Sequence, residues 1–186
     1  MTPASFSASG GKRQAAFFSI DHLYQHAQKS RPMVTLNSGA MFGTVSIDKQ
    51  CTLCQACVTA CPGKALLSGD GVPQIQFVEA NCLQCGMCTR TCPENAISIT
   101  PRLLLDREQR NKLRVLYEEP AFECISCGKA FATVSVIENM LAKLQHHAMF
   151  QSERARNRLR MCEDCRVIDV VQDPDAMGTQ NEQSVH

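Results

Sequence analysis

Two stretches of this sequence, CTLCQACVTACP at residues 51–62 and CLQCGMCTRTCP at residues 82–93, decide its fold. Both have the spacing C-x2-C-x2-C-x3-C-P. Every cysteine of the first stretch has a counterpart 31 residues later in the second, as Cys51 has in Cys82, and this separation is called the repeat offset. Their flanks repeat as well, because SIDKQC at 46–51 is matched by FVEANC at 77–82. A duplicated unit with matching flanks predicts a structure built from two similar halves.

Each half predicts a strand, a cysteine loop, a short helix and a second strand. The first half has candidate strands at 44–48 and 65–68, and the second half has them at 74–78 and 96–100. The sequence SGDG at 68–71 supplies the turn between the halves. The repeat therefore predicts an α+β unit over residues 44–100.

Twelve cysteines among 186 residues are the dominant feature of the composition, since only 5% of residues are aromatic and there is no Trp. The first residues have no apolar core of signal-peptide length and no twin arginine. No stretch approaches the roughly 18 apolar residues of a membrane span. We therefore expect a cytoplasmic chain without a membrane span. In a reducing compartment, closely spaced cysteines more often bind metal than each other.

The cysteine spacing is typical of ligands to iron–sulfur cubes. Three cysteines two residues apart wrap a loop around three iron corners, and the fourth points to the cube built by the other half. Pro62 and Pro93 turn the chain as it leaves each loop, because proline fixes φ. We assign one [4Fe–4S] cluster to Cys51, Cys54, Cys57 and Cys92, and a second to Cys82, Cys85, Cys88 and Cys61.

These eight cysteines and two prolines resemble the bacterial two-cluster ferredoxin family over residues 44–100. The resemblance implies a ferredoxin-like fold with a pseudo-twofold axis and electron transfer as the activity, so we expect an electron carrier and no catalytic residues. Loaded with two clusters and one Zn²⁺, the chain would carry a charge of about −5 instead of the formal +1. We therefore expect a partner with a basic docking surface.

Four further cysteines lie outside the repeat, in FECISCGKAF at 122–131 and MCEDCR at 161–166. The segment CxxCG is typical of a metal knuckle, because Gly128 permits the positive φ that turns backbone amides toward thiolates. Zn²⁺ suits four thiolates in a tetrahedron. A third iron site (a cluster or a mononuclear iron) and thiol–disulfide exchange are the alternatives. We predict a zinc site formed by Cys124, Cys127, Cys162 and Cys165.

The rest of the chain divides around these motifs. Residues 1–43 are predicted to be flexible, with a short helix near 20–28, residues 101–120 to be a connector with a helical segment after Asp106, and residues 172–186 to be a disordered tail. Residues 121–171 form the predicted helical domain with the four metal-binding cysteines. Its expected apolar helix face comprises Val134, Ile137, Leu141 and Leu144. Ser152 is the expected cap of a second helix, whose arginines at 154, 156, 158 and 160 are interpreted as a solvated face or as a patch for an acidic partner or RNA.

A wider resemblance covers SITPRLLLDREQR, EEPAFECISCGKAFATVSVIENMLAKL and RMCEDCRVIDVV. These segments resemble the C-terminal part of bacterial 4Fe-4S proteins associated with molybdenum formate dehydrogenase systems. The resemblance implies a relay that passes single electrons to or from a larger oxidoreductase such as formate dehydrogenase. The alternatives are an iron–sulfur and zinc regulator that binds nucleic acid, which we do not favour, and a maturation factor that uses the distal cysteines as thiols.

Overall fold

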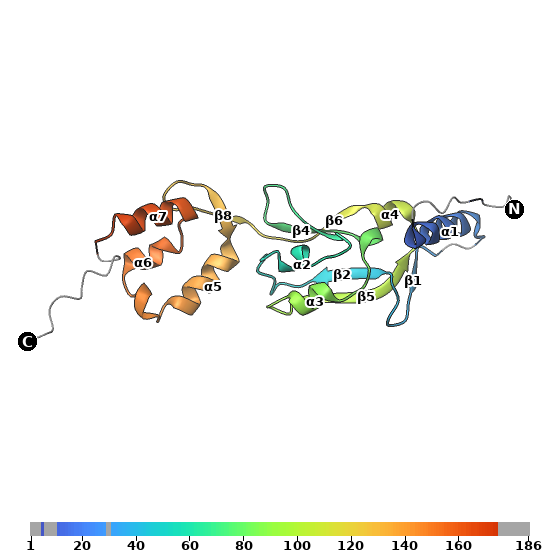
Figure 1. Ribbon diagram of the computed structural model, residues 1–186, viewed down its shortest axis with the longest axis horizontal. Coiled ribbons are helices and arrows are strands. Elements are labelled where there is room, and N and C mark those ends of the chain that lie inside the picture. Colours follow the sequence, from blue (N-terminus) through green and yellow to red (C-terminus); the bar gives the residue numbers. More distant parts are fainter. Residues whose placement is uncertain (1–4, 6–10, 29–30, 175–186) are drawn as a thin grey trace, which may run out of the picture. The chain divides into compact units, whose positions relative to one another are not determined.

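The computed structural model describes residues 5, 11–28 and 31–174, and the chain divides into two compact units (Figure 1). The first unit comprises Met1–Gly69 and Gln74–Tyr117, and the second comprises Asp70–Pro73 and Glu118–His186. Helices and strands occur together in the first unit, so its fold is of the predicted α+β class. Among the described residues, no helix combines the length and the apolar character that crossing a membrane requires.

Two three-stranded sheets form the frame of the first unit. One has the strand order β1-β5-β2, with β1 at Met33–Thr35, β2 at Gly43–Ile47 and β5 at Ile97–Leu104. The other has the order β3-β4-β6, with β3 at Leu66–Ser68, β4 at Gln74–Val78 and β6 at Leu113–Glu118. Strands β2 and β5 are antiparallel, as are β3 and β4, so each pair joins a strand from one half of the repeat to one from the other.

The repeat offset recurs in the backbone of the two halves. Helix α2 at Ala56–Thr59 and helix α3 at Met87–Thr91 begin at equivalent positions, and a 3₁₀ turn, η2, spans Glu79–Asn81 before the second cysteine loop. Residues with left-handed backbone also recur in equivalent pairs: Leu53 and Gln84, Gln55 and Gly86, and Lys64 and Asn95. Left-handed residues within such loops turn successive N–H groups toward one side, which suits the loops to a negatively charged group.

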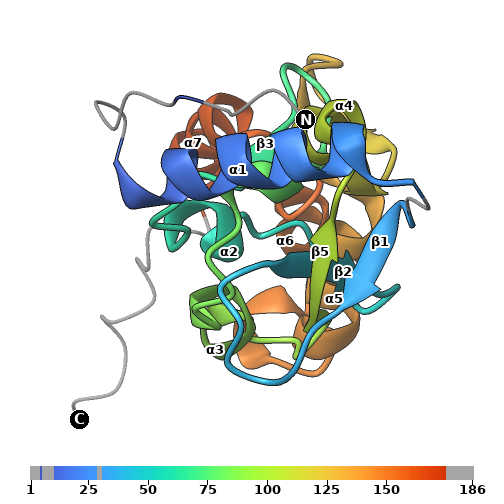
Figure 2. The same cartoon turned by 90° about the vertical axis from the view of Figure 1, so that its right-hand side faces the viewer.

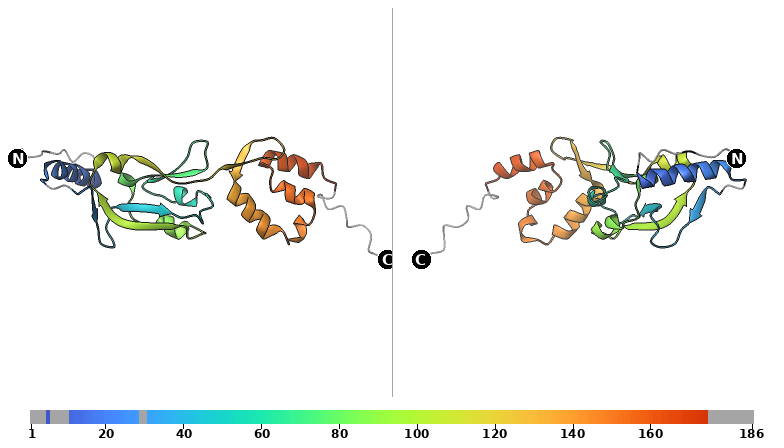
Figure 3. Two further views of the ribbon diagram at one scale, coloured as in Figure 1. Left: turned by 180° about the vertical axis from the view of Figure 1, so that it is seen from behind. Right: turned by 45° about the vertical axis from the view of Figure 1, so that its right-hand side comes forward.

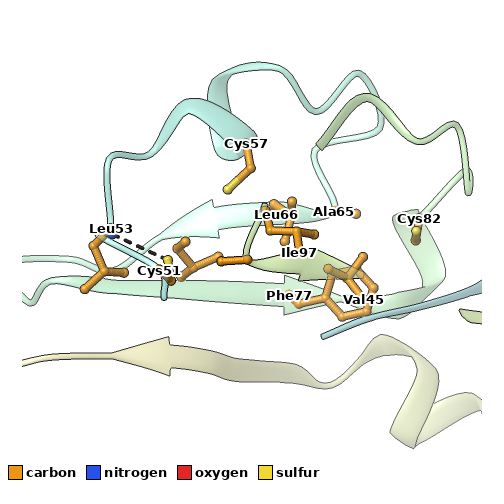
Figure 4. Close-up of a cluster of buried hydrophobic side chains, with 11 residues drawn as sticks. Val45, Cys51, Leu53, Cys57, Ala65, Leu66, Phe77, Cys82 and Ile97 are labelled. Carbon is orange, nitrogen blue, oxygen red and sulfur yellow. Dashed lines mark hydrogen bonds between the residues drawn. The ribbon is translucent and has the colours of Figure 1, made fainter. Parts of the chain in front are cut away.

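The core of the first unit lies directly beneath the cysteine loops. Phe77, Leu66 and Ile75 are each at most 2% exposed, and Cys51, Cys57 and Cys82 belong to the same buried cluster. Figure 4 shows Cys57 pointing from α2 toward the layer that contains Leu66 and Phe77. The side chains that stabilise the fold therefore also form the floor of the cysteine sites.

The N-terminal segment contributes ordered structure that the sequence did not predict. Helix α1 spans Lys12–His26, beginning well before the short helix expected near 20–28, and lies beside α4 at one end of the unit (Figure 2). None of its residues is fully buried. It is held by Arg13 and by a 2.5 Å ion pair between Asp21 and Arg110. Because charged and aromatic contacts anchor this helix, its sequence has no apolar stripe from which its full length could be predicted.

The expected connector at 101–120 is also built into the first unit up to Tyr117. Strand β5 continues to Leu104, and α4 follows at Arg107–Asn111, capped by Asp106, whose carboxylate accepts a hydrogen bond from the Gln109 amide at 3.0 Å. Strand β6 then lies beside β4. The helical segment predicted after Asp106 is confirmed, whereas the third strand was missed.

The second unit consists of a hairpin and three helices (Figure 3, orange to red). Strands β7 at Ala121–Glu123 and β8 at Ala130–Thr133 pair antiparallel, and α5 at Val134–Leu144 follows with Thr133 as its cap. A 3₁₀ turn, η3, at Ala148–Phe150 leads to α6 at Glu153–Arg158, and α7 spans Glu163–Val171. The hydroxyl of Ser152 accepts a hydrogen bond from the Ala155 amide at 3.1 Å, so the predicted cap is confirmed.

Two of the four arginines near α6 have acidic partners on or just after α7. Arg154 and Arg158 both pair with Asp169, and both also pair with Asp173. These ion pairs join the two helices, so the arginines predicted as a solvated face or a patch are partly used inside the unit. Of the predicted tail 172–186, residues 175–186 lie outside the described residues.

Candidate cluster sites and metal centre

The first set of assigned cysteines lines one cavity. Cys51 and Cys54 lie in the loop before α2, Cys57 lies in α2, and Cys92 ends α3. Ile75 and Ile97 form the apolar wall of this cavity. Cys57 is 4% exposed, whereas Cys54 is exposed. The structure thus places the fourth cysteine of the second half beside the first three of the first half.

The second set lines another cavity in the same way. Cys82 and Cys85 precede α3, Cys88 lies in it, and Cys61 comes from the first half of the repeat. Leu66 and Phe77 are among the apolar lining residues of this cavity. Here Cys85 is the exposed cysteine, at the position equivalent to Cys54.

Hydrogen-bond donors face sulfur atoms of both sets. The amide of Ala65 donates to Cys61 Sγ at 3.3 Å, and the amide of Ala96 donates to Cys92 Sγ at 3.4 Å, which are equivalent contacts in the two halves. The side-chain amide of Gln84 donates to Cys82 Sγ at 3.4 Å. Such bonds stabilise thiolates and tune the potential of a cluster that they bind.

Burial and repulsion from neighbouring cysteines oppose the ionisation of one thiol in each set, Cys57 and Cys88. Burial, followed by the nearby Cys51, Cys54 and Cys88, raises the pKa of Cys57 to about 12. Burial also raises the pKa of Cys88, together with Cys82 and Cys61. A set of four thiolates here requires a positively charged core, which an iron–sulfur cluster supplies. The donor chemistry, the N–H groups and the cavities therefore fit [4Fe–4S] clusters.

An arginine frame around the second loop was missed by the sequence analysis. Glu79, only 4% exposed, accepts two hydrogen bonds from Arg102 at 2.8 and 2.7 Å, and one from Arg114 at 2.6 Å. The hydrogen bonds to Glu79 raise the pKa of Arg102. The only signal in the sequence is a lone Glu between a strand and Cys82, followed by an arginine-rich segment.

The last four cysteines form a different kind of site in the second unit. Cys124 and Cys127 lie in the loop of the β7–β8 hairpin, and Cys162 is the N-cap of α7, with Cys165 in its first turn. All four Sγ atoms lie within 4.8 Å of one another. The Sγ atoms of Cys127 and Cys162 are 3.7 Å apart. Four thiolates at about 2.3 Å from one Zn²⁺ give a tetrahedral edge of about 3.8 Å.

Backbone geometry explains why the two pairs meet. Gly128, with φ of 76°, closes the hairpin turn, and its amide donates to the carbonyl of Cys124 at 2.8 Å. The amide of Ile125 donates to the carbonyl of Arg160 at 3.2 Å, which ties the knuckle to the segment before α7. The positive φ predicted for Gly128 is confirmed.

The pKa values of two thiols of this site are shifted in opposite directions. Burial of the Cys124 thiol opposes its ionisation, but hydrogen bonds from the amides of Cys162, Cys127 and Ser126 outweigh it and lower the pKa to about 6. Cys165 accepts a hydrogen bond from Ser126, yet its three sulfur neighbours raise its pKa to about 12. The lowered pKa of Cys124 favours its thiolate, the form that binds a divalent cation. Among the described residues, no second such group of three or more His, Cys, Asp or Glu side chains occurs.

The comparisons with known proteins agree with the cysteine geometry. Residues 50–97 match the model of a 4Fe-4S dicluster domain. An iron-sulfur protein of Rhodospirillum rubrum is 30% identical over 78 residues, which are 41% of this chain and 40% of that protein. The ferredoxin-type protein NapF of Escherichia coli K12 is 39% identical over 49 residues, 26% of this chain and 30% of the relative.

A third relative is matched over most of its length. The ketoisovalerate oxidoreductase subunit VorC of Methanothermobacter marburgensis is 36% identical over 56 residues, which are 27% of this chain and 71% of VorC. By contrast, the chain spans less than half of the length of the first two relatives. The fold and the cysteine loops define an iron–sulfur protein of the ferredoxin type. The chain belongs to the 4Fe-4S ferredoxin family.

Proposed function

We propose that this protein is an electron relay that holds two [4Fe–4S] clusters, one on each of the two cysteine sets. The observation that carries the proposal is the exchange of the fourth cysteine, since each cavity is lined by three cysteines from one half and one from the other. The recurrence of strands, helices and left-handed residues at the repeat offset supports a ferredoxin-like arrangement with a pseudo-twofold axis.

The chain's own residues define what such a site does. Each set offers four thiolates, one for every iron corner, so the protein leaves no coordination position for a substrate. When bound, clusters of this kind supply outer-sphere transfer of one electron at a time. Cys54 and Cys85 are exposed, one in each set, and give each site an edge at the protein surface. Helices α2 and α3, which carry Cys57 and Cys88, contact each other and so bring the inner edges of the two sites together.

The third cysteine set is proposed to hold one structural Zn²⁺. The 3.7 Å separation of the Cys127 and Cys162 sulfur atoms supports a single ion, because the thiolates of a cluster extend outward from separate iron corners and lie farther apart. We propose residues 121–171 as the zinc domain. The proposed two-cluster domain, expected over residues 44–100, extends to Tyr117, because the first unit takes in most of the expected connector at 101–120. In this role the metal joins the hairpin to α7 and carries no electrons.

The proposed partner is a larger oxidoreductase with a basic docking surface, and formate dehydrogenase is the named candidate. The resemblance of the C-terminal part to proteins of formate dehydrogenase systems supports this candidate. The name of VorC, an oxidoreductase subunit, supports only the broader class of a larger oxidoreductase. The thiolates of the loaded chain make it net negative, so association should weaken as salt screens the charges. We propose no nucleic-acid partner.

Electron transfer to the partner tests this function directly. Formate is added anaerobically to catalytic amounts of a molybdenum formate dehydrogenase and an excess of the oxidised holoprotein. The proposal predicts bleaching of the cluster absorption and appearance of a reduced-cluster EPR signal, with up to two electrons per chain. The rate should fall at high salt. Reduction by dithionite without reduction by formate would leave the relay in place and reject this partner.

A further inference from the structure

The two halves of the repeat differ in what contacts the backbone before each cysteine loop. The carbonyl of Ala80 and the carbonyl of Lys49 occupy equivalent positions, related by the repeat offset. Ala80 accepts hydrogen bonds from the guanidinium of Arg13 at 3.0 and 3.2 Å. Lys49 accepts one from the neutral hydroxyl of Tyr117 at 3.5 Å. The backbone carbonyl before the second cysteine loop thus contacts a charged guanidinium, whereas the equivalent carbonyl before the first loop contacts an uncharged hydroxyl.

Arg13 also contacts a cluster ligand itself. Its Nη2 donates to the carbonyl of Cys82 at 2.6 Å, and its Nη1 donates to the carbonyl of Met41 at 3.0 Å. The guanidinium lies 5.1 Å from the ring centre of Phe17 and 4.8 Å from that of Phe42. These contacts fix a partly buried charge beside the second cysteine set, where solvent screens it less than an exposed charge.

Neighbouring charges increase the difference. Glu79, just before Cys82 in the chain, is paired with both Arg102 and Arg114, so this group adds one net positive charge on the same side. Glu94, in contrast, lines the cavity of the first cysteine set. Among the partly buried charges, those around the second set are therefore more positive than those around the first. Lys49, at the position equivalent to Ala80, carries its charge on an exposed side chain that solvent screens.

We propose that Arg13 raises the reduction potential of the cluster held by Cys82, Cys85, Cys88 and Cys61, and so makes it the resting place of the electron. This inference rests on the proposed two-cluster function. A cluster gains one negative charge on reduction, and a fixed cation beside it stabilises the reduced form. Arg13 is thus a positioning residue that acts through the carbonyl of Cys82 and through its charge.

The step that this charge biases is internal and balanced. One electron leaves the reduced cluster of the first set and enters the oxidised cluster of the second set, with no proton transferred and no bond formed or broken. Electrons then enter preferentially at the edge of Cys54 and rest beside Cys85. Electron transfer then favours the direction from the first cysteine set to the second, although the two halves of the repeat are similar in sequence.

Film voltammetry of the complete holoprotein tests the proposal, because it reports the potential of each cluster. Arg13→Met removes the charge while its length preserves packing between Phe17 and Phe42, and Arg13→Gln removes the charge but keeps a donor. Arg13→Lys keeps the charge. The exposed neighbour Lys12 supplies the matched control, Lys12→Met.

The wild type should show two one-electron waves. In both neutral variants the wave at the higher potential should move to a lower potential, while the other wave stays. The ratio of electrons on the second cluster to electrons on the first should fall by about threefold to tenfold. A tenfold change corresponds to about 59 mV for a one-electron couple. Arg13→Lys and Lys12→Met should stay near the wild type. A wild type with fewer than two clusters rejects the proposed function itself.

Three other results overturn the inference alone. The first is a wild type with eight irons whose two clusters share one potential. The second is a pair of neutral variants in which both waves or only the lower wave moves, or neither does. The third is loss of the second cluster from both neutral variants with retention in Arg13→Lys, because Arg13 would then be structural.

Discussion

The two units of this protein use cysteine in contrasting ways. In the first, eight cysteines surround two cavities, and three of them belong to the hydrophobic core with Phe77 and Leu66. In the second, four sulfur atoms gather within 4.8 Å, and the largest fully buried apolar side chain is Ile137. The distances at which the backbone holds the cysteine sulfur atoms determine whether a site suits a cluster or a single metal ion.

The contrast also concerns what stabilises each unit. The first unit has two sheets, a continuous core and an arginine frame around Glu79 that exist alongside the cysteines. In the second unit, Cys124 and Cys162 are themselves among the few buried residues. We expect a small domain with so little apolar core to depend on the proposed metal to fold. Removing a ligand should therefore affect the two units very differently.

The largest expected effect follows from Cys162→Ser in the second unit. Loss of one ligand removes most of a zinc-binding free energy of about 10–16 kcal/mol, so this unit should unfold while the iron content stays unchanged. Limited proteolysis and circular dichroism measure the loss of α5–α7. If the variant stays folded but loses a thiol-exchange activity, the structural role is wrong and the thiol alternative holds.

The second expected effect separates the two clusters. Cys57→Ser and Cys88→Ser are equivalent changes in the two halves of the repeat, and each should reduce the iron content from about eight to about four per chain. The second unit should keep its zinc and its helices in both variants. Unchanged iron in either variant, or loss of zinc with the iron, would contradict the division of the cysteines into independent sets.

A third change weakens the frame of the first unit. Glu79→Gln leaves Arg102 and Arg114 without their buried carboxylate, and breaking such a pair costs about 3–5 kcal/mol. Thermal unfolding of the holoprotein should show a lower midpoint for the first unit alone. Exposed Glu108→Gln serves as the control and should change nothing. Equal midpoints for both variants would show that the ion pairs do not support the loop.

The smallest expected effect is in the second unit. Thr133 caps α5 by accepting a hydrogen bond from the Val136 amide at 3.3 Å, so Thr133→Ala should destabilise this unit by about 1 kcal/mol. Chelator titration followed by circular dichroism measures the change, with exposed Glu138→Ala as the control. Unfolding as complete as that of Cys162→Ser would mean that the metal is not what stabilises the unit.

Much of the fold could be predicted because the repeat fixes local structure. The strands expected at 44–48, 65–68 and 74–78 lie within one residue of β2, β3 and β4. The apolar spacing around Ile137 predicted α5 because its buried face obeys the helical period. Cysteine spacing also predicted the grouping of sulfur atoms around the two cavities, because a fixed loop length determines which thiols converge.

The remainder depends on long-range contacts that leave no periodic signal. Helix α1 docks through Arg13 and Asp21, whose partners at Cys82 and Arg110 are 69 and 89 residues away. The ion pairs of Glu79 likewise join segments that are distant in sequence. Such contacts depend on the finished fold, so neither residue composition nor spacing reveals them.

Anaerobic purification followed by iron, sulfide and zinc analysis tests the central claim most directly. Two clusters and one single-ion site predict about eight irons, eight sulfides and one zinc per chain. About twelve irons without zinc would show that the last four cysteines hold a third cluster, and about four irons would show that the repeat holds only one.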